Sequence, residues 1–172
     1  MRRDYIETPP GLRLIGVILG LLLAGCGAEN DLPTLRTDVE FRSDGTLSFL
    51  TLSGDTVTTI DIEIAETDEA RTRGLMGRRS LPAQSGMFFI MDEVDTTGFW
   101  MRNTPLPLDI LFVAPDSQII NISKRTTPFS EAVIRPDAPK KYVVEVRAGF
   151  TDRRGITDGM RVDWTRTQTP VR

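Results

Sequence analysis

Asp109 is the residue whose setting most suggests chemistry. It lies in residues 107–113, where both alternating faces of a strand would be apolar, and such a strand is normally buried on both sides. An unpaired carboxylate there would be costly, so Asp109 should be neutral, paired or directed into a cavity. The same pattern suits a structural carboxylate that accepts hydrogen bonds from a turn, from Arg78 or from Arg102.

Glu145 is the second acidic candidate. In residues 142–147 it shares a strand face with Val143 and Arg147. Paired with Asp109 across a sheet, it could form an acid–base or nucleophile couple, or supply a site for a hard cation. The neighbouring Arg147 favours the alternative, a glutamate on the solvent face.

A short polar cluster around Trp100 could hold a ligand. On a strand, Trp100 and Arg102 share one face, and Asn103 follows directly. An aromatic ring beside a guanidinium and an amide can grip a polar ligand by stacking and fixed hydrogen bonds. The alternative is a core tryptophan followed by an ordinary turn. The predicted ligand-binding residues are Trp100, Arg102, Asn103, Asp109 and Arg78, the last of which could clamp a carboxylate or phosphate.

Composition excludes several classes of site. The 172-residue chain has no histidine, one cysteine and a formal net charge of −3. The missing histidine removes Ser-His-Asp and Cys-His catalysis and imidazole metal sites, and one cysteine cannot form an internal disulfide. The charge offers no attraction to nucleic acid. We therefore expect no cofactor, no metal and no nucleic-acid partner.

The first residues predict export and lipid attachment. Arg2, Arg3 and Arg13 precede twelve uncharged residues, 14–25, a length typical of a signal peptide and too short to span a membrane. The ending Leu-Ala-Gly-Cys at 23–26 resembles a bacterial lipobox, which implies a lipid on Cys26. We expect a signal peptide at 1–25, a polar tether at 26–37, and a domain facing the periplasm from a lipid anchor in the envelope. Gly27, where aspartate would retain the protein at the inner membrane, favours the outer membrane.

Apolar periodicity predicts a mainly β domain over residues 38–172. Strands are expected at residues 46–52, 56–64, 87–91, 98–101, 108–113, 118–124, 142–147 and 160–164. One short helix should begin after Thr67, a good N-cap, and end at Gly74 and Gly77. Asp61 and Glu63 are expected on the wet face of the first hairpin. The pattern favours an antiparallel β-barrel or sandwich with one short helix.

A series of motifs between Ile60 and Val162 carries a family resemblance. They are RGLMGR at 73–78, LP at 81–82, GMFF at 86–89, FWMRNT at 99–104, PLDILF at 107–112, YVVEV at 142–146, AG at 148–149 and GI at 155–156 with Gly159. In this order they resemble the bacterial and archaeal family called domain of unknown function 192. The resemblance implies a jelly-roll-like β fold, often preceded by a signal peptide, and no established activity.

Three functional hypotheses follow. The favoured one is a lipid-tethered binding module whose pocket takes a small anionic or glycan-like envelope component, or a segment of an envelope protein. The second is a histidine-free hydrolase that uses Asp109 and Glu145 on an envelope glycan. The third is a purely structural envelope protein.

Overall fold

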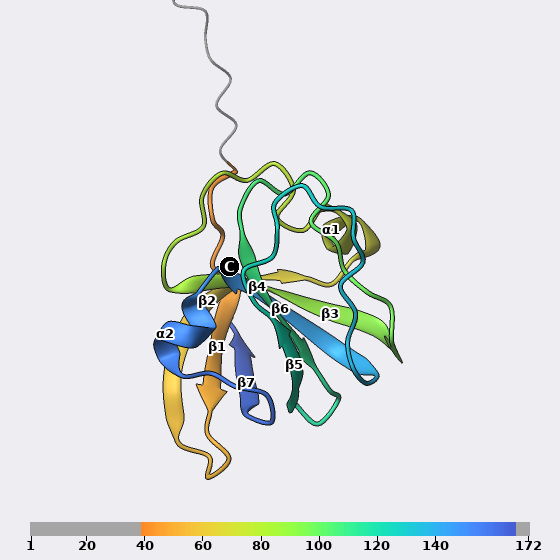
Figure 1. Cartoon of the computed structure of the whole chain (residues 1–172). Coiled ribbons are helices and arrows are strands. Elements are labelled where there is room, and N and C mark those ends of the chain that lie inside the picture. Colours follow the sequence, from red (N-terminus) through yellow and green to blue (C-terminus); the bar gives the residue numbers. More distant parts are fainter. Residues whose placement is uncertain (1–38, 168–172) are drawn as a thin grey trace, which may run out of the picture. The chain divides into compact units, whose positions relative to one another are not determined.

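The computed structural model of the chain describes residues 39–167, which form a mixed β-sheet with two short helices (Figure 1). The strands are β1 (Gly45–Leu50), β2 (Thr56–Ala65), β3 (Ser85–Asp95), β4 (Leu108–Val113), β5 (Ile119–Ser123), β6 (Lys140–Arg147) and β7 (Arg161–Arg166). The helices are α1 (Asp68–Arg73) and α2 (Phe150–Arg154). Cys26 and the expected tether lie outside the described residues. In the part of the chain that is described, no helix is long and apolar enough to cross a membrane.

The predicted mainly β fold is confirmed, but the sheet is mixed rather than antiparallel. Its strand order is β5-β4-β6-β3-β2-β1-β7. β2 and β3 pair in parallel, and parallel neighbours require a crossover connection, which here contains α1. The sheet remains open, although its two edges approach each other at an isolated bridge between Gln118 and Arg161.

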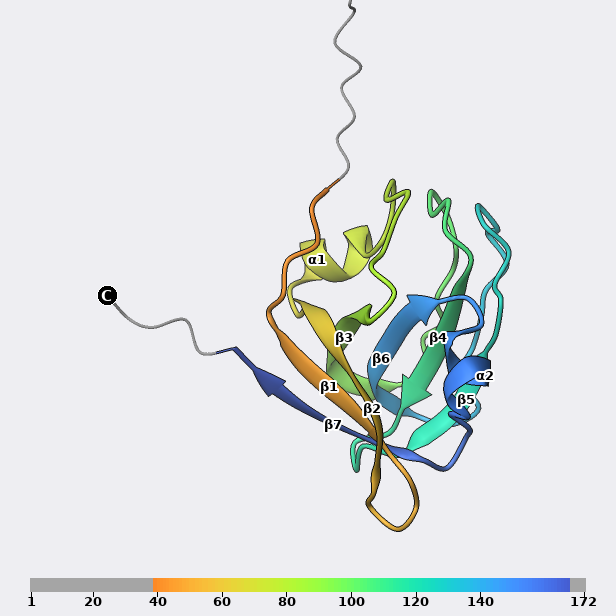
Figure 2. The ribbon, with the colours of Figure 1, turned by 90° about the vertical axis from the view of Figure 1, so that its left-hand side faces the viewer.

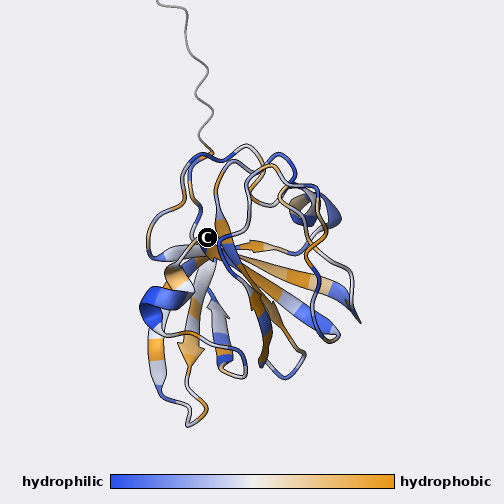
Figure 3. Ribbon diagram, in the orientation of Figure 1, coloured by the Kyte–Doolittle hydropathy of each residue, from blue (hydrophilic) through white to orange (hydrophobic). Residues whose placement is uncertain are grey.

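Both faces of the sheet are covered around β4, the second strand of the sheet, which is buried along its whole length. One face packs Leu111, Val144 and Phe150 of α2 into a first core. The other face packs Phe112, Val143 and residues that follow α1 into a second core. Figures 1 and 2 show the two helices on different sides of the sheet. Figure 3 shows β4 as largely hydrophobic and both helices as mainly hydrophilic.

Local signals place α1 where the sequence predicts it. The Thr67 hydroxyl accepts a hydrogen bond from the Ala70 amide at 3.2 Å, and Gly74 ends the helix with a φ of 45°. Residues 98–101, expected as a strand, form a loop that meets another loop at the bridge between Phe99 and Ile134. The second helix, α2, is not predicted because five residues are too few to show a helical period.

Asp109 stabilises the structure as a hydrogen-bond acceptor. Its carboxylate is fully buried and accepts the backbone amides of Arg125, Gly149 and Thr151 at 2.9, 3.0 and 3.1 Å. The Thr151 hydroxyl adds a fourth bond at 2.7 Å. These donors come from the loop after β5 and from the start of α2, so one side chain joins both to β4. The turn-bonded alternative for Asp109 therefore describes its environment.

Asp109→Asn is expected to lower the free energy of unfolding by about 3 kcal/mol, because the amide replaces one acceptor oxygen with a donor and leaves buried donors unpartnered. Urea unfolding followed by circular dichroism measures the change. The matched control is Asp163→Asn on β7, an exposed position that should change stability by less than about 0.5 kcal/mol. A loss below about 1 kcal/mol for Asp109→Asn would contradict the role.

Candidate ligand-binding pocket

A cavity of about 300 Å³ lies between α1, β3 and the loop that follows β3. Its walls are mostly apolar and include three aromatic side chains. The lining residues are Asp68, Arg71, Thr72, Arg73, Gly74, Leu75, Met76, Phe89, Met91, Thr97, Gly98, Phe99, Trp100, Thr104 and Glu145. The volume is at the lower end of the range of about 300–1,000 Å³ found for small-molecule sites.

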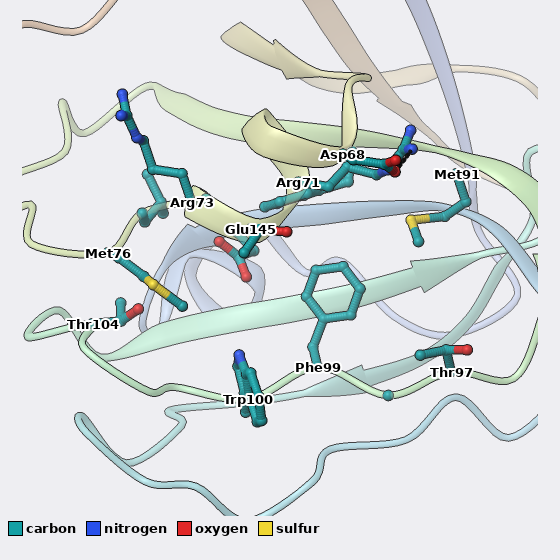
Figure 4. A pocket seen from close by; sticks show the side chains of 15 residues that line it. Asp68, Arg71, Arg73, Met76, Met91, Thr97, Phe99, Trp100, Thr104 and Glu145 are labelled. Atoms are coloured by element: carbon teal, nitrogen blue, oxygen red, sulfur yellow. Dashed lines mark hydrogen bonds and ion pairs between the residues drawn. The ribbon is translucent and has the colours of Figure 1, made fainter.

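Glu145 is the single polar group that β6 contributes to this pocket, and Figure 4 shows it among the lining side chains. In the sheet it lies between Met87 of β3 and Ile110 of β4, and it is 5% exposed. Within residues 39–167 its carboxyl has neither a hydrogen-bond partner nor an ion-pair partner. Burial raises the pKa of Glu145 to about 8. The carboxyl therefore carries a proton for most of the time at neutral pH.

The arginines near the pocket do not neutralise Glu145. The Arg71 guanidinium donates to Asp68 at 2.6 Å, to Asp92, and to the backbone carbonyls of Glu66 and Ile90 at 2.6 and 2.9 Å. Arg73 is 69% exposed, lies 3.7 Å from Glu69 on its own helix, and extends away from the pocket in Figure 4. Both guanidinium groups therefore interact with groups other than the Glu145 carboxyl.

The expected exposure of Glu63 is wrong. Glu63 is 3% exposed, and Arg78 donates to its two oxygens at 2.7 and 2.5 Å. The Arg42 amide adds a bond at 2.8 Å. Arg78, predicted to clamp a ligand, is 7% exposed, and its guanidinium binds Glu63 inside the protein instead. Alternation along β2 correctly separates its two faces, but the face of Glu63 is covered by Arg78, fifteen residues further on.

Of the predicted ligand-binding residues, the structure brings Trp100 to the pocket. Trp100 is 47% exposed rather than part of the core, and the Arg102 guanidinium lies 5.7 Å from its ring centre. Arg102 is 53% exposed and lies 3.7 Å from Glu131. Asn103 is exposed in a left-handed turn, with a φ of 56°, and its carbonyl accepts the Gly77 amide. Neither Arg102 nor Asn103 is among the lining residues.

The two candidate acids do not face each other. Across β4 and β6, Ile110 pairs with Glu145 and Asp109 pairs with Val146. Because side chains alternate between the faces of a sheet, Asp109 and Glu145 point to opposite sides. This arrangement removes the couple on which the predicted hydrolase depends. In the described part of the chain, no group of three or more cysteine or acidic side chains is placed to hold a metal ion.

Sequence reasoning missed most of the apolar wall. Phe99, Met76 and Met91 were not candidates, because isolated apolar residues in loops and strand ends look like ordinary core. The burial of Glu145 follows from the pairing of β6 with the wholly buried β4, which the sequence does not show. Arg147 lies on the same face of β6 and is exposed, so alternation alone does not distinguish the two positions.

Comparisons with known proteins identify relatives but no activity. Residues 49–164 match the model of the DUF192 family, described as an uncharacterized ACR. No curated protein matches. A crystal structure of a proposed transcription regulator from Sinorhizobium meliloti 1021 is 36% identical, with a TM-score of 0.67, and covers 73% of this chain and 98% of that one. A crystal structure of a protein of unknown function from Novosphingobium aromaticivorans DSM 12444 is 34% identical, with a TM-score of 0.65. The match covers 69% of this chain and 84% of that one.

Glu145 should make stability depend on pH in a range where little else titrates. Because its pKa is about 8 in the folded chain and near 4.5 when unfolded, the folded state alone holds the proton between these values. The free energy of unfolding should therefore fall as pH rises, by about 4 kcal/mol from pH 4.5 to 8. Glu145→Gln should remove this dependence.

Urea unfolding at pH 5.5, 6.5 and 7.5 measures the slope. The chain has no histidine, and the ordinary pKa values of its other side chains lie outside this interval. Glu93→Gln, at an exposed position on β3, is the matched control and should keep the wild-type slope. An unchanged slope in Glu145→Gln would show that another group is responsible.

Proposed function

The chain belongs to the DUF192 family, and because membership assigns no activity, we propose from the pocket that the domain binds a small molecule with an apolar body. The proposal places Glu145 at the polar end of the ligand and Phe89, Phe99 and Trp100 along its apolar part. The lipid anchor predicted at Cys26 would hold this domain at the periplasmic side of the envelope.

One observation carries the proposal: a buried carboxyl without a partner opens onto an apolar cavity. In residues 39–167 every fully buried side-chain nitrogen or oxygen has a hydrogen-bond partner. The Glu145 oxygens, which have no partner, are therefore not fully buried but open onto the cavity that Glu145 lines, and burying them further without a partner would be costly. Apolar walls with a few convergent polar groups and a perturbed pKa are typical of small-molecule sites.

The ligand class differs from the anion that the sequence suggested. An anionic group would lack a partner cation, because Arg78 is bound to Glu63 and Arg71 to Asp68 and Asp92. A neutral or cationic group needs no such partner. We do not extend the regulator description of the Sinorhizobium meliloti relative to this chain, whose net charge of −3 gives no attraction to nucleic acid.

Thr97→Trp should close the pocket. Thr97 is exposed and lines the cavity, so an indole there would narrow its mouth. In a thermal-shift screen of small amphipathic compounds on the full chain, a ligand at 100 times its Kd adds about 2.7 kcal/mol and raises Tm by roughly 5–10 °C. We expect this shift in the wild type and its absence in Thr97→Trp.

Thr96→Trp is the control, since Thr96 is exposed but does not line this cavity. It should respond to the same compounds as the wild type. Equal shifts in both tryptophan variants would place the binding elsewhere. No shift with any compound would favour the structural envelope role instead.

Cys26→Ser should release the protein from the membrane. Serine lacks the sulfur atom to which the lipid would be attached. Without the acyl chains, the protein loses about 0.8 kcal/mol of membrane affinity for each CH₂ group that would be buried in the membrane. Fractionation of cells and mass spectrometry of the mature N-terminus measure the outcome. Ser53→Ala, an exposed change in the described domain, should leave the protein in the membrane fraction. Retention of Cys26→Ser in the membrane fraction would contradict the anchor.

A further inference from the structure

Two buried glutamates lie in the same row across the sheet. Glu63 of β2 is the register partner of Met87 on β3, and Met87 is the partner of Glu145 on β6. Register partners share a face, so both glutamates point to the side that α1 covers. The backbones of β2 and β6 are two strand spacings of about 4.8 Å apart, so roughly 10 Å separates the backbone positions of the two glutamates. Their exposed fractions, 3% and 5%, are nearly equal.

The protein supplies a cation to the first of these glutamates. The Arg78 guanidinium meets the Glu63 carboxylate through two parallel bonds, at 2.7 and 2.5 Å, and is itself buried. A bidentate pair of this kind satisfies a buried carboxylate in both charge and hydrogen bonding. Glu63 therefore shows what a carboxylate in this row requires.

The second glutamate receives no such cation from the chain. The charged side chains that line its pocket are Asp68, Arg71 and Arg73. Arg71 is held by Asp68 and Asp92. Arg73 is 69% exposed and extends away from the pocket in Figure 4. No Lys or Arg nitrogen in residues 39–167 forms an ion pair with Glu145. The cavity occupies the space beside a carboxyl that the protein leaves unpaired.

Aromatic rings complete the environment that a cation prefers. Phe99 meets Phe89 edge to face, with ring centres 5.1 Å apart, and both line the pocket. Trp100 lines the same pocket and remains half exposed. The negative faces of such rings attract ammonium and guanidinium groups, most strongly where water is excluded. The sulfur atoms of Met76 and Met91 add polarizable surface for an apolar body.

We infer that the pocket binds an organic cation, an ammonium or guanidinium group on a small apolar body, whose charge takes at Glu145 the place that Arg78 takes at Glu63. This inference rests on the proposed function, since it names the ligand class of the same pocket. The apolar body lies against Phe99 and Trp100, and the cation reaches the carboxyl on β6.

Binding of such a cation is coupled to a proton. Burial keeps the pKa of the free Glu145 carboxyl at about 8, whereas a bound cation favours the ionised form. Binding at pH 7 therefore releases close to one proton. Affinity should rise by up to about tenfold between pH 6 and 7. The other charged side chains that line this pocket are Asp68, Arg71 and Arg73.

Isothermal titration of the full chain with matched probe pairs tests the inference. The probes are n-butyl to n-octylammonium and 2-phenylethylammonium ions, each compared with the alcohol of the same skeleton. We expect the ammonium ion of the best pair to bind at least tenfold more tightly than its alcohol. Titration in two buffers of different ionisation enthalpy should show the released proton.

Glu145→Gln should abolish the preference for the cation, and Glu93→Gln should retain it. Circular dichroism checks that each variant is folded, and Glu145→Met provides a second neutral side chain if glutamine is not tolerated. Equal binding of alcohols and ammonium ions, or a cation preference that survives in Glu145→Gln, would overturn the inference and leave the pocket function standing. Failure of both probe series, together with a flat compound screen, would overturn the proposed function as well.

Discussion

The burial of the central strands on both faces is the constraint on which the rest of this structure depends. β4 has no exposed residue, and β6 beside it and β3 on the far side of β6 contribute residues to the same two cores. Any polar side chain placed there loses water on whichever face it occupies, so it must find a partner inside the protein. The fold consequently assigns specific donors to Glu63 and Asp109, and these bonds hold nearby loops and the start of α2 against the sheet.

Three carboxyl groups meet this constraint in three ways. Backbone amides satisfy Asp109 and thereby fasten the start of α2 and the loop after β5. A guanidinium satisfies Glu63 and draws the segment after α1 against the sheet. Glu145 has neither solution, and the protein instead leaves a cavity beside it. The first two arrangements explain architecture, and the third is the basis for assigning a function.

Elements that depend on neighbouring residues were predictable from the sequence. The burial of a strand face by a segment that is distant along the chain was not. The first hairpin and the helix after Thr67 depend on neighbouring residues, so their patterns gave nearly correct bounds. Alternation placed Glu63 and Glu145 on definite strand faces, but an exposed face and a face covered by a loop have the same periodicity. The parallel pairing of β2 with β3 and the position of Trp100 depend on crossover and loop geometry that no local pattern contains. The motifs did identify the family correctly, over residues 49–164.

The position of β7 determines when the sheet can be completed. This last strand pairs with β1, so residues 45–50 and 161–166 are neighbours although almost the whole domain separates them along the chain. A nascent chain holds β1 with one side unpaired until its final strand emerges from the ribosome. Pairing between sequence-distant strands also slows folding. A polypeptide with this topology therefore completes its sheet only after residues 161–166 have been synthesised, and not while synthesis of the earlier strands proceeds.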